Sequence, residues 1–429
     1  MENFIKDIIV SVGYDDVEKP NLIQYEYEPN WLPRDDTNPK RYQYWLKMEN
    51  FFGNQYHTFN VNTIQHFKNT NENFIYPIVL YSNSLFSRYQ TIDFGDDLLE
   101  RIKNKKAKIV FLYITEGWFG ETKYHYDWFE NLALKHSLEK EDIVIITANL
   151  SAEKNYEGNK FTIITYNYFV DELNFANIKK RDDLCIKLFK NKYLKFIDNF
   201  KIKNHFLCFN NLTKLHRLWI FYELMNNPKL KNKSILSLNK STIDKSFFEV
   251  VNRLTNYQEM IEYYKTYNSN IGYSYDTTNW EKDVSAGDTI NINAHLNTFV
   301  NIVTETLYHN DVIFLTEKTY KAIYSCQPFI IVGNSLTLKK LKELGFKTFD
   351  KWWDESYDDE MDFEKRMYKI TKLLEEIASW DFEKCTLIRK EMREILIHNY
   401  NQMLDTTEMQ TFYSKIQTDT KKIEKSKLL

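Results

Sequence analysis

The stretch that decides the fold reads Phe299-Val-Asn-Ile-Val-Thr-Glu-Thr-Leu-Tyr308, followed by Phe314-Leu-Thr-Glu-Lys-Thr-Tyr-Lys-Ala-Ile323 and Pro328-Phe-Ile-Ile-Val-Gly333. Residues 299–304 and 328–333 are short apolar runs typical of buried strands, and 316–325 carries the start signals of a helix. A strand, a helix and a second strand of these lengths form parallel strands joined by a crossover. This part of the chain is therefore predicted to be α/β.

The same alternation of strands and helices extends along most of the chain. Strands are expected at 8–12, 78–81, 109–113, 143–148, 161–166, 205–210, 234–238 and 347–349. Helices are expected at 126–136, 173–199, 215–225, 247–267, 336–344, 362–380 and 382–399. Two consecutive series predict two Rossmann-like domains that face each other across a cleft, spanning 1–200 and 201–400, with a tail over 401–429.

Composition narrows the class of protein. The 429 residues are 43% hydrophobic and 27% charged, which is typical of a soluble globular protein. The net charge of -3 and the pI of about 6.4 argue against tight binding to duplex nucleic acid, although they leave room for a local basic groove.

The spacing of the cysteines and the length of the apolar runs indicate the cellular compartment of the protein. The cysteines are Cys185, Cys208, Cys326 and Cys385. No two of them form a CxxC, so we expect free thiols in a reducing environment and no zinc site. The N-terminus lacks the pattern of a signal peptide, and no apolar run is long enough to span a membrane. These features predict a cytoplasmic protein.

Several polar residues gather around the first strand and helix of the opening stretch. Glu305 follows the strand, Thr316 is placed to cap the helix, and Glu317 and Lys318 fall in its first turn. A helix N-terminus and a lysine attract phosphate, and a carboxylate at a strand end can accept two ribose hydroxyls. These are the parts of a nucleotide-sugar site. The plain alternative is a capped helix with a solvated lysine.

A family resemblance favours the nucleotide-sugar interpretation. Glu305, then Thr316-Glu317-Lys318, then the proline-led strand at Pro328 resemble the donor-binding motif of α-1,3-fucosyltransferases, in which Phe-Glu-Asn-Ser precedes Tyr-Val-Thr-Glu-Lys. The resemblance implies a GT-B fold, with Glu317 and Lys318 against the nucleotide sugar. The chain departs from the family in having Val303-Thr-Glu-Thr306 and a slightly longer spacing, 12 residues from 305 to 317. This departure bears on the donor sugar more than on the fold.

A second resemblance covers residues 203–400. It is carried by His205-Phe-Leu-Cys-Phe-Asn-Asn-Leu-Thr-Lys-Leu-His-Arg217, the Thr-Glu-Lys block, Gly345-Phe-Lys-Thr-Phe349 and Trp353-Asp-Glu-Ser-Tyr-Asp358. Together these motifs are similar to uncharacterised bacteriophage proteins regarded as glycosyltransferases. The resemblance implies a nucleotide-sugar domain at 201–400, an acceptor-side domain at 1–200, and location in the host cytoplasm if a phage encodes the chain.

Further donor-site candidates follow the predicted strand at 205–210. They are Asn210, Lys214, His216 and Arg217, with Lys321 a weaker candidate on the helix that begins near Thr316. Glycosyltransferases of the GT-B fold place cationic groups at this loop, on the donor diphosphate. The fork of Arg217 suits phosphate oxygens, which makes Arg217 the strongest of this group. A salt bridge or a solvated helix start is the plain alternative for Arg217, His216 and Lys214.

The acceptor side offers one candidate base. In Ile114-Thr-Glu-Gly-Trp-Phe-Gly120, Glu116 follows a predicted strand and could deprotonate an acceptor hydroxyl, while Trp118 could stack on a sugar. His125 and Asp127 are weaker candidates for the base. The plain alternative for Glu116 is a loop carboxylate that caps the following helix.

Missing motifs narrow the chemistry. No clear Asp-x-Asp is present, which favours metal-independent transfer in which lysine, arginine and a helix dipole neutralise the leaving diphosphate. The acidic stretch 354–362 lacks the EF-hand pattern and is predicted to be a solvated loop. Phosphate-loop, GxSxG and HExxH signatures are also missing.

The sequence therefore predicts a hexosyl- or pentosyltransferase that moves a sugar from a nucleotide-sugar co-substrate to an acceptor hydroxyl without a further cofactor. One alternative is a non-catalytic glycosyltransferase-like virion or host-interaction protein. Another is a phage enzyme that glycosylates DNA bases, which requires a basic groove; 103–108 is the one local lysine run. The donor, the acceptor and the oligomeric state stay open.

Overall fold

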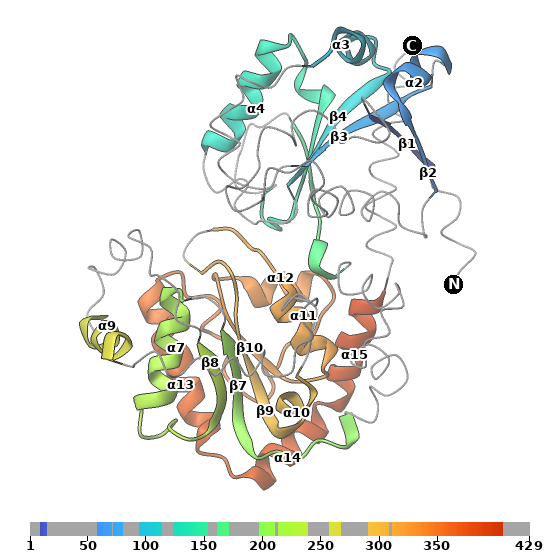
Figure 1. Cartoon of the computed structure of the whole chain (residues 1–429). Helices are drawn as coiled ribbons and strands as arrows, with labels where there is room; N and C mark the ends of the chain where they lie inside the picture. The colour runs from blue at the N-terminus through green and yellow to red at the C-terminus, as the bar shows by residue number, and fades with distance from the viewer. Residues whose placement is uncertain are drawn as a thin grey trace, which may run out of the picture. The chain divides into compact units, whose positions relative to one another are not determined.

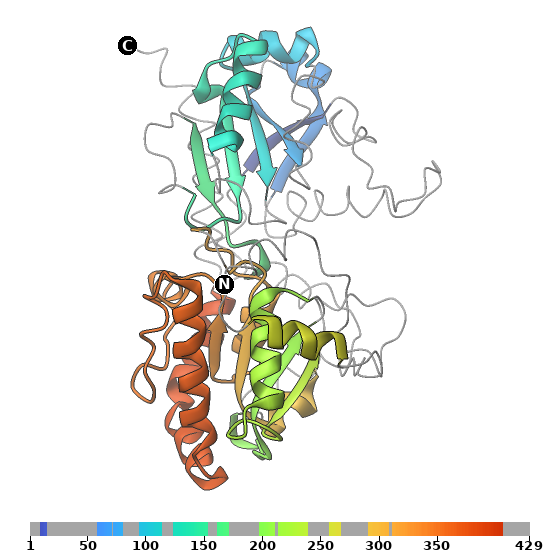
Figure 2. The same cartoon turned by 90° about the vertical axis from the view of Figure 1, so that its left-hand side faces the viewer.

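The computed structural model describes residues 9–14, 58–70, 72–79, 94–113, 123–152, 161–170, 197–210, 213–238, 257–266, 291–308 and 311–405. The described residues up to Tyr168 form one compact unit, and those from Phe169 to Asp405 form a second (Figures 1 and 2). Each unit is built on a parallel β-sheet, as the sequence predicts. The predicted boundaries and the facing arrangement of the two domains stay predictions. Among the described helices, none has both the length and the apolar character needed to cross a bilayer.

The first unit contains a six-stranded sheet in the order β2-β1-β3-β4-β5-β6. Its strands are β1 (Ile9–Tyr14), β2 (Thr58–Thr63), β3 (Phe74–Val79), β4 (Ala107–Tyr113), β5 (Ile143–Thr147) and β6 (Thr162–Thr165). Its helices are α2 (Ile64–Thr70), α3 (Asp96–Lys103), α4 (Lys123–Lys135) and the short 3-10 helix η3 (Lys140–Asp142). All of β5 is buried, because both faces of a parallel sheet are covered by crossover helices.

Aromatic side chains join α4 to this sheet. Phe111 of β4 meets Phe129 edge-on at 4.9 Å and Trp128 at 5.8 Å between ring centroids. Edge-to-face pairs at these distances add to the stability gained from apolar burial. The predicted helix at 126–136 and the strands beside it are thus confirmed, with α4 beginning three residues earlier than expected.

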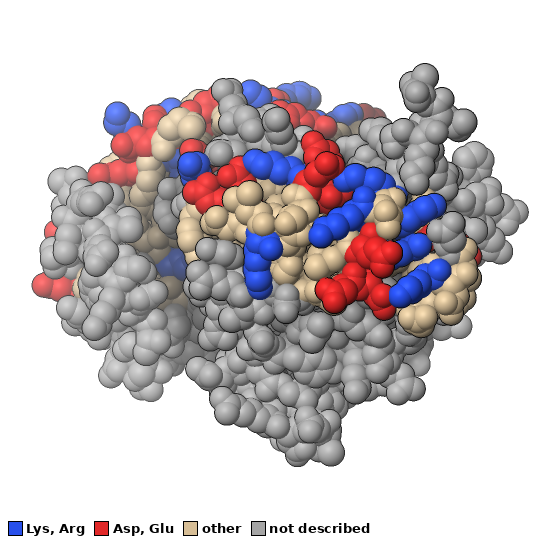
Figure 3. Space-filling model, turned by 90° about the horizontal axis from the view of Figure 1, so that it is seen from above, with Lys and Arg blue, Asp and Glu red and all other residues tan. Residues whose placement is uncertain are grey.

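The lysine run at 103–108 does not form a uniformly basic face. Lys105 pairs with Glu139 at 2.5 Å and with Asp142 at 2.7 Å. On the neighbouring helix Lys68 pairs with Asp97 at 2.6 Å. Figure 3, which looks onto the first unit, shows acidic and basic side chains interleaved on the visible described surface. Two carboxylates therefore offset the positive charge of Lys105 within this run.

The second unit contains a four-stranded parallel sheet in the order β10-β9-β7-β8. Its strands are β7 (Asn204–Asn210), β8 (Ser234–Leu238), β9 (Thr298–Thr304) and β10 (Phe329–Val332). Its helices are α7 (Leu215–Asn226), α9 (Tyr257–Thr266), α10 (Ile292–Asn297), α11 (Glu317–Tyr324), α12 (Thr337–Glu343), α13 (Phe363–Ala378), α14 (Phe382–Glu391) and α15 (Arg393–Leu404).

The strand order of the second sheet reverses between β7 and β9. The chain moves outward from β7 to β8, returns to β9 on the other side of β7, and continues outward to β10. Right-handed crossovers in opposite directions place α7 and α11 on opposite faces of the sheet. In agreement, α7 packs with α13, whereas α11 packs with α15 (Figure 1). In open sheets of this kind, ligands bind beside the carboxyl ends of the strands at the reversal.

Two predictions near the C-terminus are wrong. No strand forms at 347–349, because the side chain of Asn399 takes both backbone groups of Lys347, accepting from the amide at 2.7 Å and donating to the carbonyl at 2.8 Å. The helix expected at 382–399 is two helices, α14 and α15, which meet at Met392. Most of the helix predicted at 173–199, and residues 247–256 of the helix predicted at 247–267, lie outside the described residues.

Candidate functional site

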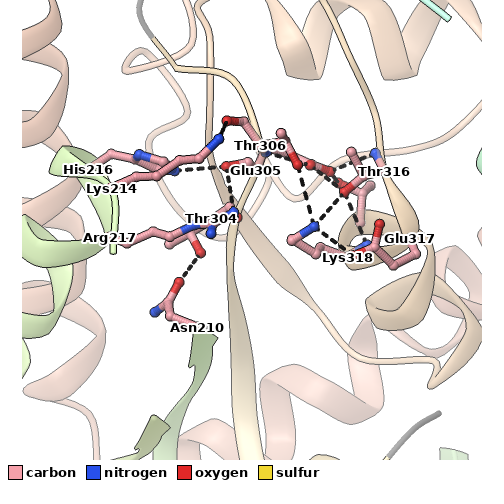
Figure 4. Close-up of polar contacts among 11 residues, drawn as sticks. Asn210, Lys214, His216, Arg217, Thr304, Glu305, Thr306, Thr316, Glu317 and Lys318 are labelled. Carbon is pink, nitrogen blue, oxygen red and sulfur yellow. Dashed lines mark hydrogen bonds and ion pairs between the residues drawn. The ribbon is translucent and has the colours of Figure 1, made fainter. Parts of the chain in front are cut away.

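Polar side chains gather where β7 and β9 end (Figure 4). The hydroxyl of Thr304, the last residue of β9, donates a hydrogen bond to the side-chain oxygen of Asn210, the last residue of β7. Asn210 also donates to the sulfur of Cys208 at 3.2 Å and is 4% exposed. The buried side chain of Asn210 therefore links β7 and β9, the two strands between which the strand order reverses.

Glu305 lies directly after β9 and is 1% exposed. One carboxylate oxygen accepts from the Thr316 amide at 3.0 Å and the Thr319 hydroxyl at 2.6 Å. The other accepts from the Thr316 hydroxyl at 2.6 Å and the Thr306 amide at 3.1 Å. These four bonds fill the acceptor capacity of a carboxylate. Glu305 thus anchors the N-terminus of α11 to the end of β9, and a ribose hydroxyl would have to displace one of these donors.

Thr316 caps α11 as the sequence predicts. Its hydroxyl accepts from the Lys318 amide at 3.4 Å, and its backbone is extended, as is usual at an N-cap. The Lys318 ammonium donates to the Glu317 carboxylate at 2.6 Å and to the Thr316 hydroxyl at 3.2 Å. The side chains of Lys318 and Glu317 keep 30% and 20% of their surface exposed. Both are therefore accessible from solvent at the end of the helix.

The carboxylate of Glu317 is held ionised. Burial raises its pKa, but the charge and hydrogen bond of Lys318, with the charge of Lys321, outweigh this and leave the pKa below its ordinary value. Lys321 is half-buried in the same short helix. A fixed negative charge and two positive charges thus lie together on α11.

Two lysines reach Thr306 from helices on opposite faces of the sheet. Lys214, the N-cap residue of α7, donates to the Thr306 carbonyl at 2.7 Å. Lys318 of α11 lies 3.5 Å from the Thr306 hydroxyl. Figure 4 shows the two ammonium groups approaching Thr306 from its two sides. Positive charge therefore converges on a half-buried loop residue at the strand reversal.

Arg217 and His216 lie beneath this loop and bind its backbone. The ring nitrogen Nε2 of His216 donates to the Glu305 carbonyl at 2.8 Å, which fixes the proton on that nitrogen because a carbonyl only accepts. Arg217 donates longer bonds to the Glu305 and Thr304 carbonyls, at 3.3 and 3.4 Å. Desolvation lowers the pKa of Arg217, although the charges of Glu305 and Glu317 oppose it. Both residues are at most 3% exposed.

The acceptor-side candidates are only partly described. Glu116 and Trp118 lie outside the described residues, and their roles stay predictions. His125, in the first turn of α4, is 4% exposed, and burial lowers its pKa to about 4. Its imidazole is therefore neutral at pH 7. Asp127 is half-buried and lies 3.7 Å from the ammonium of Lys123.

Carboxylates of the acidic stretch at 354–362 accept hydrogen bonds from the protein's own backbone and side chains. Asp354 accepts from the amide and hydroxyl of Ser356, at 2.9 and 2.8 Å. The buried carboxylate of Asp358 accepts from the Leu338 and Lys339 amides and so caps α12. Within the described ranges, no group of three or more histidine, cysteine, aspartate or glutamate side chains is arranged to hold a metal ion.

Sequence reasoning missed the threonines that complete this site, and Gly333. Thr306, Thr319 and Thr304 carry hydrogen bonds to the predicted residues, yet a threonine has no distinctive signal in a sequence. A Cβ at Gly333 would lie 3.3 Å from the Cβ of Glu305. A glycine at the end of β10 was thus the available signal that the backbone passes close to Glu305.

Comparisons with known proteins give a distant likeness. No family model and no curated protein matches the chain. A crystal structure of an α1,3-fucosyltransferase aligns over 96% of this chain and 90% of its own, with a TM-score of 0.41 and 14% identity. A structure of an α1,3-fucosyltransferase with GDP aligns over the same shares, with a TM-score of 0.37 and 13% identity. Scores below 0.5 do not establish a common fold.

Proposed function

We propose that this chain is a glycosyltransferase that moves a sugar from a nucleotide-sugar donor to an acceptor hydroxyl. The donor diphosphate binds at the carboxyl ends of β7 and β9. The observation that carries the proposal is the convergence of Lys214 and Lys318 on Thr306 at the strand reversal. Open α/β sheets bind their ligands at this position.

The partners of the two lysines support binding of an anion. Lys214 donates to a neutral carbonyl, and Lys318 shares its protons among two threonine hydroxyls and Glu317. A phosphate oxygen is a stronger acceptor for an ammonium than a carbonyl or a hydroxyl. The same two charges would stabilise the diphosphate as it leaves the sugar, which is where negative charge develops in glycosyl transfer.

The remaining residues have supporting roles in this proposal. Glu317 and Lys318 lie against the donor, while Glu305, Arg217, His216 and Asn210 hold the strand ends and the helix N-terminus in place. Thr316 caps the helix, and Lys321 adds positive charge. Glu116 is the proposed base, with Trp118 against the acceptor. The proposed reaction belongs to a GT-B-like enzyme and uses neither a metal nor a further cofactor.

A thermal-shift screen tests the donor site. The full chain is heated with UDP-, GDP-, ADP-, CMP- and dTDP-linked sugars, because a ligand that binds only the folded state raises the midpoint in proportion to ln(1 + [L]/Kd). We expect one nucleotide class to raise the midpoint, and Lys214→Ala and Lys318→Ala to abolish the effect. Lys390→Ala is the matched control, since Lys390 is exposed on α14, which lies near the amino end of β9.

The outcomes of the screen are distinct. A shift that both site variants lose and Lys390→Ala keeps supports the proposal. A shift that all three variants keep places the nucleotide elsewhere. The lack of any shift at millimolar donor contradicts the proposal and favours a non-catalytic glycosyltransferase-like protein.

A further inference from the structure

Tyr308 joins the loop after β9 to two helices. Its ring stacks on His216 at 4.2 Å between centroids with an angle of 26°, and it lies 5.3 Å from the ring of Phe363 in α13. Its hydroxyl takes part in a hydrogen bond with the backbone of Leu215, at the start of α7. Only 8% of Tyr308 is exposed. Tyr308 is thus held by α7 on one side and by α13 on the other.

Arg366 of α13 fixes the backbone of this tyrosine. Its guanidinium donates to the Tyr308 carbonyl at 2.6 Å and to the Glu360 carbonyl at 2.8 Å. The same group lies 5.9 Å from the ring of Phe363 and is 3% exposed. Burying an arginine is costly, and here both bonds go to backbone carbonyls rather than to a carboxylate. The charges of Asp358, Glu360 and Asp362 offset part of this cost, and the two hydrogen bonds tie Arg366 to the backbone of the loop.

The loop is fixed at its other residues as well. His216 holds the carbonyl of Glu305, and Lys214 holds that of Thr306. Leu307 is 2% exposed in the apolar core. Four consecutive residues, 305–308, are therefore restrained from α7, α11 and α13 at once. Thr306, on which the two lysines converge, is partly exposed, whereas the other three residues are buried.

We infer that Arg366 and Tyr308 are positioning residues for the anion site at Thr306, acting through the backbone of residues 305–308. This inference rests on the proposed function for the identity of the ligand. Its structural part does not depend on the ligand. Loss of the hydrogen bond from Arg366 to the Tyr308 carbonyl loosens the loop and moves Thr306 relative to Lys214 and Lys318. Because a binding site loses affinity when its groups must be ordered on binding, a looser loop binds the anion more weakly.

Two measurements on the full chain test the inference. The first is hydrogen exchange without ligand, for peptides covering 303–308 and 314–320. We expect Arg366→Met to exchange at least about tenfold faster there, while β7 is unchanged. Tyr308→Phe, which removes only the hydroxyl, gives a smaller change in the same peptides. The control is Arg393→Met, since Arg393 pairs with the exposed Asp198 at 3.0 Å.

The second measurement is calorimetric titration with inorganic pyrophosphate. We expect Arg366→Met to weaken binding about tenfold, and Arg366→Lys, which keeps the charge but loses the fork, to weaken it less. Unchanged exchange at 303–320, or equally faster exchange throughout the second unit, would overturn the inference. If the unmodified chain does not bind pyrophosphate, the proposed anion site fails, whereas the exchange result still decides whether Arg366 positions the loop.

Discussion

Replacing Glu305 by glutamine should destabilise the second unit by about 3 to 5 kcal/mol. The carboxylate accepts four hydrogen bonds, two at each oxygen, and is 1% exposed. In either orientation the amide of Gln places its NH₂ group against one backbone N–H, of Thr306 or of Thr316. A threonine hydroxyl can rotate to become an acceptor, but a backbone N–H cannot.

The magnitude follows from these contacts. A buried donor left without an acceptor costs about 1 to 3 kcal/mol, and replacing a charged acceptor by a neutral one weakens each of the two bonds that the remaining oxygen accepts by about 1 kcal/mol. The two contributions sum to the range above. Glu317→Gln is the matched control, because the Glu317 side chain is 20% exposed and pairs with the ammonium of the next residue, Lys318. We expect that control to change stability by about 1 kcal/mol or less.

The assay is urea unfolding followed by tryptophan fluorescence, to which the buried Trp219 and Trp353 of the second unit contribute. A loss near 4 kcal/mol for Glu305→Gln and near zero for Glu317→Gln agrees with the anchoring role. A loss below about 1 kcal/mol for Glu305→Gln would refute it. If that variant kept its stability but lost nucleotide binding, Glu305 would contact the ligand directly, as its position at the end of a strand suggests.

Two further predictions concern stability. Gly333→Ala should lower the free energy of unfolding by about 1 to 3 kcal/mol, because the added Cβ would lie 3.3 Å from the Cβ of Glu305. The control is Gly95→Ala, whose added Cβ meets nothing within 4 Å and should change stability by about 1 kcal/mol or less. Equal effects of the two variants in urea unfolding would contradict this prediction. Hydrogen bonds from Asn227 and then Lys229 lower the pKa of Glu375 to about 2 from its ordinary 4.5. The lowered pKa stabilises the fold above pH 4.5, and this contribution is lost as pH falls toward 2. Because Lys229 is exposed, solvent weakens its interaction with Glu375. We therefore expect Glu375→Gln to remove about 1 to 2 kcal/mol of the loss of stability between pH 5 and pH 2. A profile of stability against pH that is unchanged in this variant would show that the pKa of Glu375 is not lowered.

Much of the fold could be predicted because its strands are buried on both faces. Strand β5 begins at Ile143, where it was predicted, with all five of its residues buried, and β9 begins one residue earlier than expected, with all seven of its residues buried. The errors arise where partners are distant in sequence. Nothing near Lys347 shows that Asn399, 52 residues later, satisfies its backbone. No glycine or proline marks the break at Met392.

The candidate site was predictable in its members but not in its connections. Thr316 and Lys318 could be placed because a capped helix has a local signature. The meeting of Lys214 with Thr306 spans 92 residues and depends on the order of the strands, which periodicity does not reveal. The saturation of Glu305 depends on hydroxyls from the first turn of α11. For these reasons the sequence suggested a ligand contact for Glu305 but did not reveal the four hydrogen bonds that its carboxylate accepts.

The most direct test of the central claim is release of a nucleoside diphosphate from a panel of nucleotide sugars by the full chain, with Lys318→Ala beside it. Water can take the place of the acceptor hydroxyl, so release can be followed without knowing the acceptor. The account predicts release from one nucleotide class and at least a tenfold loss in the variant, equivalent to about 1.4 kcal/mol of transition-state stabilisation. If a nucleotide sugar bound but no nucleoside diphosphate was released, with or without added acceptors, the enzymatic claim would be contradicted. The chain would then be a protein that only binds nucleotide sugars.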